Sequence, residues 1–371
     1  MGAATWAQGM IAVAAVIGMA SGGSAAVPDG SARTSVQAAA SPDALAVPAP
    51  KAGRGRHLVA ILADNEGTET TDFIVPFGVL KESGVARVVA VSTGPGTVAL
   101  MPALRAKADL TTSQFDAENP GGADILIVPA MHTADKPAVV AWIRAQAAKG
   151  AVVVAICAGA ATLGHAGLLD GRAVTTHWYM KSWLARRFPA ARVVDDRRYV
   201  QDGPVVSTSG VTASIPVSLA LVEAMAGRSA AAATAHRLGI SGWSAGHASA
   251  RFSLKAGHVA AGLWNLARFW SRERVDIPVA DGFDEIAVAL AADAWSQTYR
   301  SRAHAVSPEW SAVFSRRGLV ILTDGPDDRS HVVTPPAPSG TAVDRVLADI
   351  AHRYGRPTAD LVVLHLEYAA P

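Results

Sequence analysis

Apolar runs and helical patterns alternate along the first two thirds of this chain. Several runs are mostly apolar, without a polar residue at every second position, which is typical of central parallel strands covered on both faces. These predicted strands are His57–Ala63, Arg87–Thr93, Ala123–Pro129 and Ala151–Ile156. Helical spacing of apolar residues follows between them, at Phe73–Lys81 and Ala138–Lys149. This alternation predicts an α/β domain with a doubly wound parallel sheet and helices on both faces.

The last third is weaker in pattern. Residues 229–274 are alanine-rich and predict a helical connector. Residues 275–371 predict a smaller α/β region, whose strand, loop, helix and strand repeat the order of the first domain, with a final strand at Leu361–Leu366. Because this region holds no cysteine, it is interpreted as a truncated, non-catalytic copy that covers the first domain or forms a homodimer face. A chance α/β segment is the alternative.

The amino terminus has the composition of an export signal. Met1–Ala26 carries no charged side chain, and the apolar run Met10–Ala20 is followed by small residues. No Lys or Arg precedes that run, so an uncleaved membrane anchor or a start codon placed too early are alternatives. We expect the protein to be exported to the periplasm or the extracellular space, or to be tethered to a membrane. If the start codon is placed too early, we expect a cytoplasmic protein. Residues 27–55 read as a disordered linker, which leaves 56–228 as the first domain.

Composition excludes several kinds of site. The 371 residues include 33 basic and 31 acidic ones, a balance that does not indicate a nucleic-acid partner, and no pair of helix-turn-helix units follows the first domain. A single cysteine excludes an internal disulfide and a multi-cysteine zinc site. The histidines form no metal-binding spacing, and no phosphate-binding glycine loop occurs, so we expect neither metal nor cofactor.

The single cysteine, Cys157, ends the strand Ala151–Ile156 and precedes the small residues Ala158 and Gly159. This predicts a tight strand-to-helix turn that holds the thiol at the carboxyl edge of the sheet. Backbone N–H groups of Ala158 and Gly159 at the helix start would lower the pKa of the thiol and could hold an oxyanion. A lone cysteine is more often a small buried apolar residue.

The turn ICAGA, with GLLDGR at Gly167–Arg172 and TTHW at Thr175–Trp178, resembles the ThiJ/PfpI family of the class I glutamine amidotransferase-like superfamily. The likeness is to the branch of isonitrile hydratases and the amino-terminal domains of AraC-type regulators, and it spans roughly residues 56–227. It implies a flavodoxin-like sheet with Cys157 as nucleophile. The same resemblance places the family's histidine at His177.

The family's amino-terminal acid, four residues before a proline, corresponds to Asp72 in ETTDFIVP. A helix cap is the alternative role for this carboxylate. Glu66 and Glu69 share its loop and are expected to be solvated. Where the family usually has Gly-Gly, this chain has Ala130-Met131 followed by His132, which puts the predicted oxyanion hole in doubt.

His177 could orient or deprotonate Cys157, as in other Cys–His pairs, or be a buried histidine beside Trp178. Asp195 and Asp196 are candidate orienting groups, and their spacing selects neither.

Two functions fit these residues. The first is a cysteine-dependent hydrolase or lyase that acts on a small electrophile, which the resemblance suggests is a reactive carbonyl, an isonitrile or an amide. Ala158 weakens the isonitrile assignment, because a hydroxyl residue is common there in those enzymes. The second is a ligand-binding, redox-sensing or regulator-like module without turnover.

Overall fold

The computed structural model describes residues 44–335 and 337–369. Residues 1–43, with the predicted export segment and most of the predicted linker, lie outside the described residues. The remainder of that predicted linker, residues 44–55, has no helix or strand but is bound to the first domain. Leu45 is buried, and both the Lys51 N–H and the Arg54 guanidinium donate to the Asp124 carboxylate at 2.9 Å.

Seven strands form the central sheet, in the order β11-β12-β8-β7-β1-β3-β6. Neighbouring strands are parallel except for the antiparallel edge pair β11 and β12. The strands are β1 (His57–Ala63), β3 (Ala86–Ser92), β6 (Leu110–Thr111), β7 (Ile125–Val128), β8 (Val152–Ala155), β11 (Tyr199–Asp202) and β12 (Val205–Thr208). The predicted doubly wound α/β sheet is confirmed.

Helices cover both faces of this sheet because its strands are apolar on both sides. Val59 and Ile61 of β1 pack toward one face, which is covered by α2 (Thr70–Ser83), α7 (Ser214–Ala226) and α8 (Arg228–Arg237). Leu58 and Leu62 pack toward the other face. That face is covered by α3 (Thr112–Glu118), α4 (Pro137–Ala148), α5 (Gly159–His165) and α6 (Lys181–Arg187), beside the small strand pair β9 (Ala173–Val174) and β10 (Arg192–Val193).

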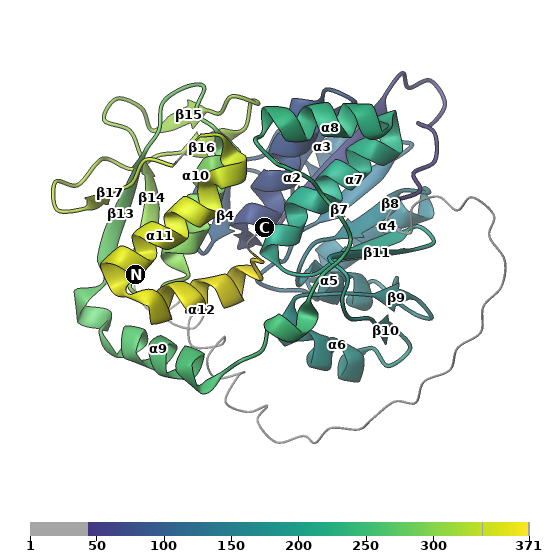
Figure 1. The fold of residues 1–371 in the computed structure, drawn as a ribbon. Coiled ribbons are helices and arrows are strands. Elements are labelled where there is room, and N and C mark those ends of the chain that lie inside the picture. The colour runs from purple at the N-terminus through teal and green to yellow at the C-terminus, as the bar shows by residue number, and fades with distance from the viewer. Residues whose placement is uncertain (1–43, 336, 370–371) are drawn as a thin grey trace, which may run out of the picture.

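The part of the chain after residue 228, which we call the second half, contains a parallel unit of its own. Strand β13 (Glu273–Pro278) lies between β14 (Ser301–Val306) and β17 (His331–Val332), with α10 (Glu285–Ser296) crossing between β13 and β14. A separate five-stranded sheet joins the two halves. It runs β15 (Ala312–Phe314), β16 (Val320–Leu322), β5 (Arg105–Lys107), β4 (Thr97–Met101) and β2 (Thr68–Glu69). The two halves, green to yellow and purple to teal in Figure 1, therefore share backbone pairing.

Helix α10 packs directly on α2. A Cβ atom at Gly78 of α2 would lie 2.5 Å from the Ile286 Cγ1 of α10, so the glycine permits this close crossing. Behind α10 lie α11 (Ala342–Tyr354) and α12 (Arg356–Leu366), and α9 (Ala256–Ala267) packs against α12. The second half thus covers the same face of the sheet that α2 and α7 cover.

One predicted element is wrong. Leu361–Leu366 was expected as a strand and is the end of helix α12. The buried residues of α12 include Thr358, Leu361, Val362 and Leu364, which recur at helical spacing. Pro357 in the first turn favours that helix start. Among the described residues, no helix combines the length and apolar character needed to cross a bilayer.

Candidate active site

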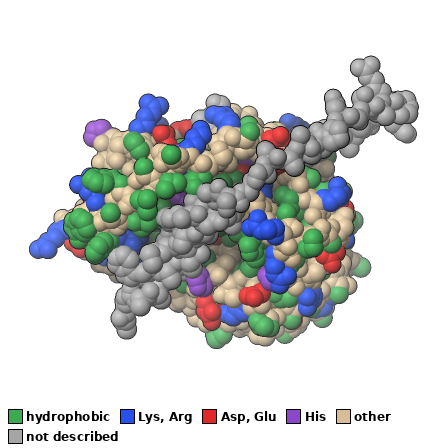
Figure 2. Space-filling model, turned by 90° about the horizontal axis from the view of Figure 1, so that it is seen from below, with side chains coloured by type: hydrophobic (Ala, Val, Ile, Leu, Met, Phe, Trp, Pro, Cys, Tyr) green, Lys and Arg blue, Asp and Glu red, His purple; other side chains and the backbone are tan. Residues whose placement is uncertain are grey.

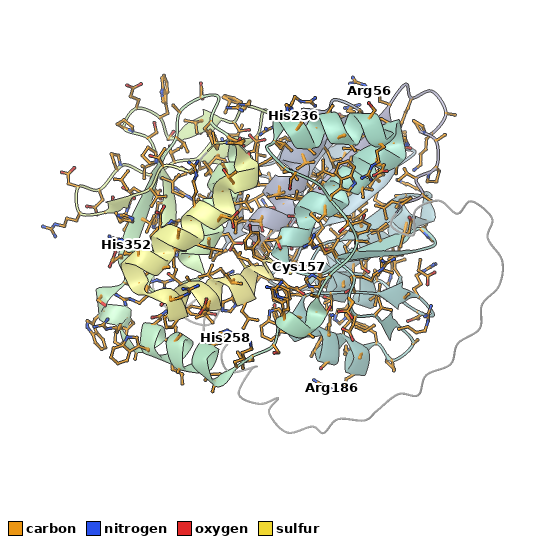
Figure 3. All side chains as sticks on the ribbon, in the orientation of Figure 1. Arg56, Cys157, Arg186, His236, His258 and His352 are labelled. Atoms are coloured by element: carbon orange, nitrogen blue, oxygen red, sulfur yellow. The ribbon has the colours of Figure 1, made fainter. Side chains whose placement is uncertain are left out.

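Cys157 lies between β8 and α5 with φ of 57°, a left-handed conformation that is strained for a residue with a side chain. Two hydroxyl groups hold its backbone. The Cys157 N–H donates to the Thr208 Oγ1 (3.1 Å), and its carbonyl accepts from the Thr176 Oγ1 (2.8 Å). The side chain lies where the two halves meet, with 5% of the residue exposed (Figure 3). The predicted strand-to-helix turn is therefore present.

The backbone groups expected to form an oxyanion hole have other partners. The Gly159 N–H donates to the Ile156 carbonyl (2.8 Å), and the Ala130 N–H donates to the Asp72 Oδ2 (3.1 Å). Met131 forms a bridge with Thr68. Of the N–H groups expected to form the hole, that of Ala158 is directed at the thiol of Cys157. A hole built from Ala130 and Gly159 is not formed in this conformation.

Gly159 has a packing role of its own. A Cβ there would lie 2.3 Å from the Val128 carbonyl oxygen, so glycine is needed for α5 to begin this close to the end of β7. Cys157, two residues before Gly159, lies near the acids at the start of α2, whose charges act on its thiol.

Two acids from the start of α2 face the thiol. Asp72, in the first turn, is fully buried, and its Oδ1 has no hydrogen-bond partner among the described residues. Glu69 caps the helix, and its Oε2 accepts from the Asp72 N–H (2.5 Å) and the Thr71 hydroxyl (2.9 Å). Glu69 is 9% exposed, so the expectation that it is solvated was wrong. Glu66 is solvated as expected, with its side chain 68% exposed beside Lys136.

These acids keep their protons more readily than free carboxyls do. Burial, followed by the charge of Glu69, raises the pKa of Asp72 well above its usual range. Burial also raises the pKa of Glu69. The pKa of the Cys157 thiol is likewise raised, first by burial and then by Asp72 and Glu69, which outweigh the Ala158 N–H. The expectation of a lowered thiol pKa is therefore contradicted. The N–H group at the start of α5 lowers the pKa by less than burial and the negative charges of the two acids raise it.

A third acid, which the sequence analysis missed, comes from the second half. Asp293 of α10 is fully buried, and burial followed by the charge of Glu69 raises its pKa well above the usual range. The only signal in the sequence was an aspartate in the middle of the otherwise apolar helix AVALAADAW. An unpaired charge on such a helix indicates a buried partner elsewhere.

His177 lies near this site without a bond to the thiol. Its Nε2 is 2.8 Å from the His365 carbonyl oxygen, to which it donates, and its Nδ1 has no partner among the described residues. Burial lowers the pKa of His177, so the ring is neutral at pH 7. The structure thus places His177 against α12 and the Tyr179 ring, whose centroid is 4.5 Å away.

Aromatic and charged groups from both halves close the site. Burial, then Cys157 and Asp72, raise the pKa of Tyr179, although part of this residue is exposed. Burial raises the pKa of Tyr299 to about 12, and its hydroxyl lies 3.1 Å from the His365 Nε2. Burial lowers the pKa of His365 to about 3. The Glu367 carboxylate accepts from the Gly210 N–H (2.6 Å) and pairs with His247 (2.8 Å).

The remaining candidate residues bond to groups other than Cys157. Asp195 pairs with Lys181, and the Asp196 carboxylate accepts from the Ser249 N–H. His132 is exposed, and its N–H donates to the Gly67 carbonyl.

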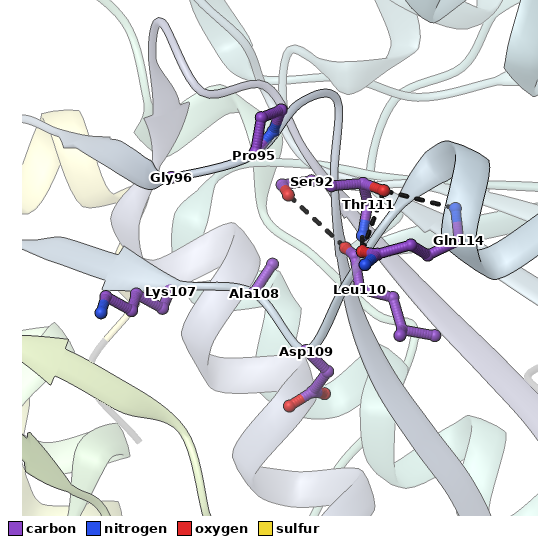
Figure 4. Close-up of a pocket in the computed structure, with 9 residues that line it drawn as sticks. All are labelled: Ser92, Pro95, Gly96, Lys107, Ala108, Asp109, Leu110, Thr111 and Gln114. Carbon is purple, nitrogen blue, oxygen red and sulfur yellow. Dashed lines mark hydrogen bonds between the residues drawn. The ribbon is translucent and has the colours of Figure 1, made fainter.

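A hollow of about 310 Å³ lies away from Cys157, at the outer strands β3 and β6. It is lined by residues such as Ser92, Asp109 and Gln114 (Figure 4). Within the described residues, no three His, Cys, Asp or Glu side chains are arranged to hold a metal ion.

Residues 57–224 match the sequence pattern of the DJ-1/PfpI family. This part of the chain is similar to the DJ-1/PfpI family. The matched segment includes Cys157, Asp72 and His177, and it ends before the second half begins.

Curated relatives match the same region. The Parkinson disease protein 7 homolog of Danio rerio is 28% identical over 187 residues, which is 48% of this chain and 94% of the relative. An isonitrile hydratase of Pseudomonas putida is 40% identical over 86 residues, 23% of this chain and 36% of the hydratase. The HTH-type transcriptional regulator CdhR of Pseudomonas aeruginosa is 36% identical over 86 residues, 23% of this chain and 25% of the regulator.

Solved structures with a similar fold cover half of the chain. A DJ-1 superfamily protein from Salmonella typhimurium is 24% identical, with a TM-score of 0.44, and is matched over 50% of this chain and 98% of its own. DJ-1beta of Drosophila melanogaster is 21% identical, with a TM-score of 0.45, over 50% of this chain and 100% of its own.

Proposed function

We propose that this protein is a cysteine-dependent hydrolase or lyase that acts on a small, uncharged electrophile. One observation carries the proposal. Cys157 is held in a strained left-handed turn, and beside it the buried Asp72 presents a carboxyl oxygen without any partner among the described residues. Strain and an unsatisfied buried acid both cost stability, and both are typical of sites kept for chemistry.

The raised pKa values of Cys157 and Asp72 suit a reaction that begins from a neutral thiol and a carboxylic acid. The sulfur forms a bond to the electrophilic carbon, and the thiol proton reaches the substrate through Asp72, which is a carboxylic acid again afterwards. With an isonitrile, addition of S–H to the terminal carbon gives a thioimidate. Water then attacks that carbon, releases the N-substituted formamide and restores the thiol.

An amide follows the same pattern. Addition and proton transfer expel the amine and leave a thioester on Cys157, which water hydrolyses to the acid and free thiol. A reactive carbonyl forms a hemithioacetal, with the thiol proton delivered to its oxygen. Because Ala130 and Gly159 use their N–H groups within the protein, the negative charge on oxygen has to be avoided by proton transfer from Asp72.

The surroundings restrict the substrate. Cys157 is 5% exposed and Asp72 is fully buried, which favours a small molecule. Three carboxyl groups, Asp72, Glu69 and Glu367, act on the thiol, with no Lys or Arg among the groups that most affect their pKa values, so an anionic substrate is disfavoured. The likeness to an isonitrile hydratase over 86 residues supports testing isonitriles alongside carbonyls and amides.

A second candidate is a ligand-binding or regulator-like module. The enclosed thiol and the occupied Ala130 N–H favour it, as does the likeness to an HTH-type regulator. A redox-sensing role is less favoured, because oxidation proceeds through the thiolate, and the raised pKa of Cys157 keeps the thiol protonated.

The test uses the full chain with an arylglyoxal, an aryl isonitrile and a simple amide, each followed by mass spectrometry of the product. Turnover by the wild-type protein and none by Cys157→Ser or Cys157→Ala, with unchanged thermal unfolding, is expected. Ser209→Ala is the matched control, since it removes a nearby buried hydroxyl group and leaves the thiol in place. Equal binding of ligand by all variants without turnover would favour the module.

A further inference from the structure

Asp293 faces an acid of the other half of the chain. Its Oδ1 accepts from the Gln297 Nε2 (3.2 Å), whereas its Oδ2 and the Glu69 Oε1 have no partner from any described donor. Glu69 lies within hydrogen-bonding reach of Asp293, in the dry contact between α2 and α10. Two carboxyl groups this close in a buried contact need a proton between them, since two adjacent buried charges are strongly disfavoured.

Glu69 also touches the next acid. It lies within hydrogen-bonding reach of Asp72, whose carboxyl group acts on the thiol of Cys157. Asp293, Glu69 and Asp72 therefore form a row of three acids that leads from the second half to the thiol; we call it the acid row. Besides these acids, the groups acting on Asp293 are Gln297 and Thr71.

No described cation compensates the acid row. The buried cation of the α2–α10 contact, Arg317, donates to Glu82, Asp284 and Glu285 instead. The charge of the row is therefore adjusted by bound protons, and a change at one acid is felt by its neighbours.

We propose that Asp293 is a positioning residue for the Cys157 site, which shares a proton with Glu69 and thereby holds Asp72 in its carboxylic acid form. The inference deepens the proposed function and rests on it. It assigns the second half a part in the chemistry, where the sequence predicted a non-catalytic copy.

Asp293→Asn in the full chain tests this. The amide keeps the shape and removes the acid, so Asp72 should release its proton at lower pH. In the pH profile of turnover with the best substrate, the fall in activity toward alkaline pH should then begin at lower pH. At the pH where the wild-type protein has lost half of its activity, the variant should be roughly three- to tenfold less active. Asp360→Asn, an exposed substitution on α12, is the matched control and should leave the profile unchanged.

Infrared spectroscopy gives a readout that needs no substrate. A carboxylic acid C=O band that survives at pH 7 in the wild-type protein, and titrates at lower pH in Asp293→Asn, is expected. No such band in the wild-type protein, or a band and pH profile unmoved by Asp293→Asn, would overturn the inference. The wild-type band decides the question if the variant does not fold. A shifted band in a protein without turnover would support the acid row and count against the proposed function.

A second inference concerns a surface far from Cys157. Residues 251–272, which include α9, expose five large apolar side chains: Leu254 (36%), Leu263 (48%), Trp264 (62%), Phe269 (54%) and Trp270 (73%). The opposite face of α9 is held by Ala261 and Asn265, and the Asn265 amide donates to the Thr358 hydroxyl of α12 at 3.1 Å. We call the exposed side the α9 surface. Figure 2 views the molecule from the side on which α9 lies in Figure 1 and shows apolar side chains beside Lys and Arg.

The charge of the α9 surface has one sign. Residues 251–272 contain no Asp or Glu, and their four Lys and Arg side chains are all exposed: Arg251, Lys255, Arg268 and Arg272. The Arg268 guanidinium lies over the Trp264 ring, 5.0 Å from its centroid. Exposed tryptophans rimmed by cations are typical of proteins that rest on anionic lipid headgroups. We infer that the α9 surface binds an anionic bilayer.

Co-sedimentation of the full chain with phosphatidylglycerol-containing and pure phosphatidylcholine vesicles tests this surface. We expect binding to the anionic vesicles only, and about tenfold weaker partition for Trp264→Ser/Trp270→Ser. Trp310→Ser is the matched control, since Trp310 is also exposed (60%) but lies outside the α9 surface. Equal binding by the double variant and the wild-type protein would overturn the inference and assign the contact to another segment.

Discussion

Helices α2 and α10 begin in the same way and end up in opposite electrostatic surroundings. Each follows a strand and a loop, and each is capped by an acid whose side chain accepts from backbone N–H groups, Glu69 in α2 and Asp284 in α10. Asp284 is also bonded by Arg317 (3.1 Å) and by the Ser339 hydroxyl (2.6 Å). Although burial alone would raise the pKa of Asp284, these partners lower it. Glu69 has no cation partner among the described residues, and burial raises its pKa.

This difference separates a structural acid from a chemical one. The acid at the start of α10 is neutralised and stabilises the fold, as a capping carboxylate usually does. Within the described part of the chain, no cation pairs with the acids at the start of α2, which lie beside a strained cysteine. Their capping positions alone would have predicted the same role for Glu69 and Asp284.

The largest expected effect removes the chemistry from the α2 side. Cys157→Ser should lower turnover by at least about 10³-fold, because the hydroxyl is a far weaker nucleophile at the same position. Unfolding should change little, since Thr208 and Thr176 bond to the backbone of residue 157. Product assays and thermal denaturation together check this. Residual turnover near the wild-type level would move the chemistry away from the cysteine.

The next largest expected effect follows from removing Arg317, the cation that pairs with the acids at the start of α10. Arg317→Met leaves Glu82, Asp284 and Glu285 without their shared partner, whose side chain is 5% exposed. Breaking such a buried pairing costs about 3–5 kcal/mol of unfolding free energy. Urea denaturation measures it. A loss below about 1 kcal/mol would mean that the two helix starts do not differ as described.

Asp72→Asn tests whether the carboxyl group at the start of α2 transfers a proton to the substrate. An amide can still accept from the Ala130 N–H but cannot carry a proton, so turnover should fall by about 10²-fold or more. Initial rates with the best substrate measure the fall. Unchanged rates would show that the proton reaches the substrate by another route.

The smallest effect is a gain in stability. Because the pKa of Asp72 is raised in the folded state, it costs stability as pH rises from the usual carboxyl range toward the folded pKa. Asp72→Asn should therefore stabilise the protein by about 1–2 kcal/mol at pH 7.5, and less at pH 4. Denaturant curves at the two pH values show the difference. A destabilised variant at pH 7.5 would indicate an ionised, well-paired Asp72.

The pattern of the first domain was readable from sequence because its strands and helices are defined locally. The apolar run of β8 and the small residues after it predicted the turn at Cys157. The last six residues of α12, five of them apolar, form a segment short enough to fit a strand or a helix, and only the packing of that segment decided between them.

The site itself was only partly predictable. Asp72 was predicted from the family resemblance, through its spacing to Pro76, but Glu69 and Asp293 become site residues only because α10 crosses α2 at Gly78, some 200 residues away in the chain. The sign of the Cys157 pKa shift was mispredicted for the same reason. The helix start is visible in sequence, whereas the burial and the neighbouring acids depend on tertiary packing.

The most direct test of the central claim, that burial and then the neighbouring acids keep the Cys157 thiol protonated, is the pH dependence of its alkylation by iodoacetamide in the wild-type protein and in Asp72→Asn. Slow alkylation, which accelerates only above the range of a free thiol near about 8.5, is expected for the wild-type protein, and acceleration at lower pH for Asp72→Asn. Rapid alkylation at neutral pH that Asp72→Asn leaves unchanged would contradict the account.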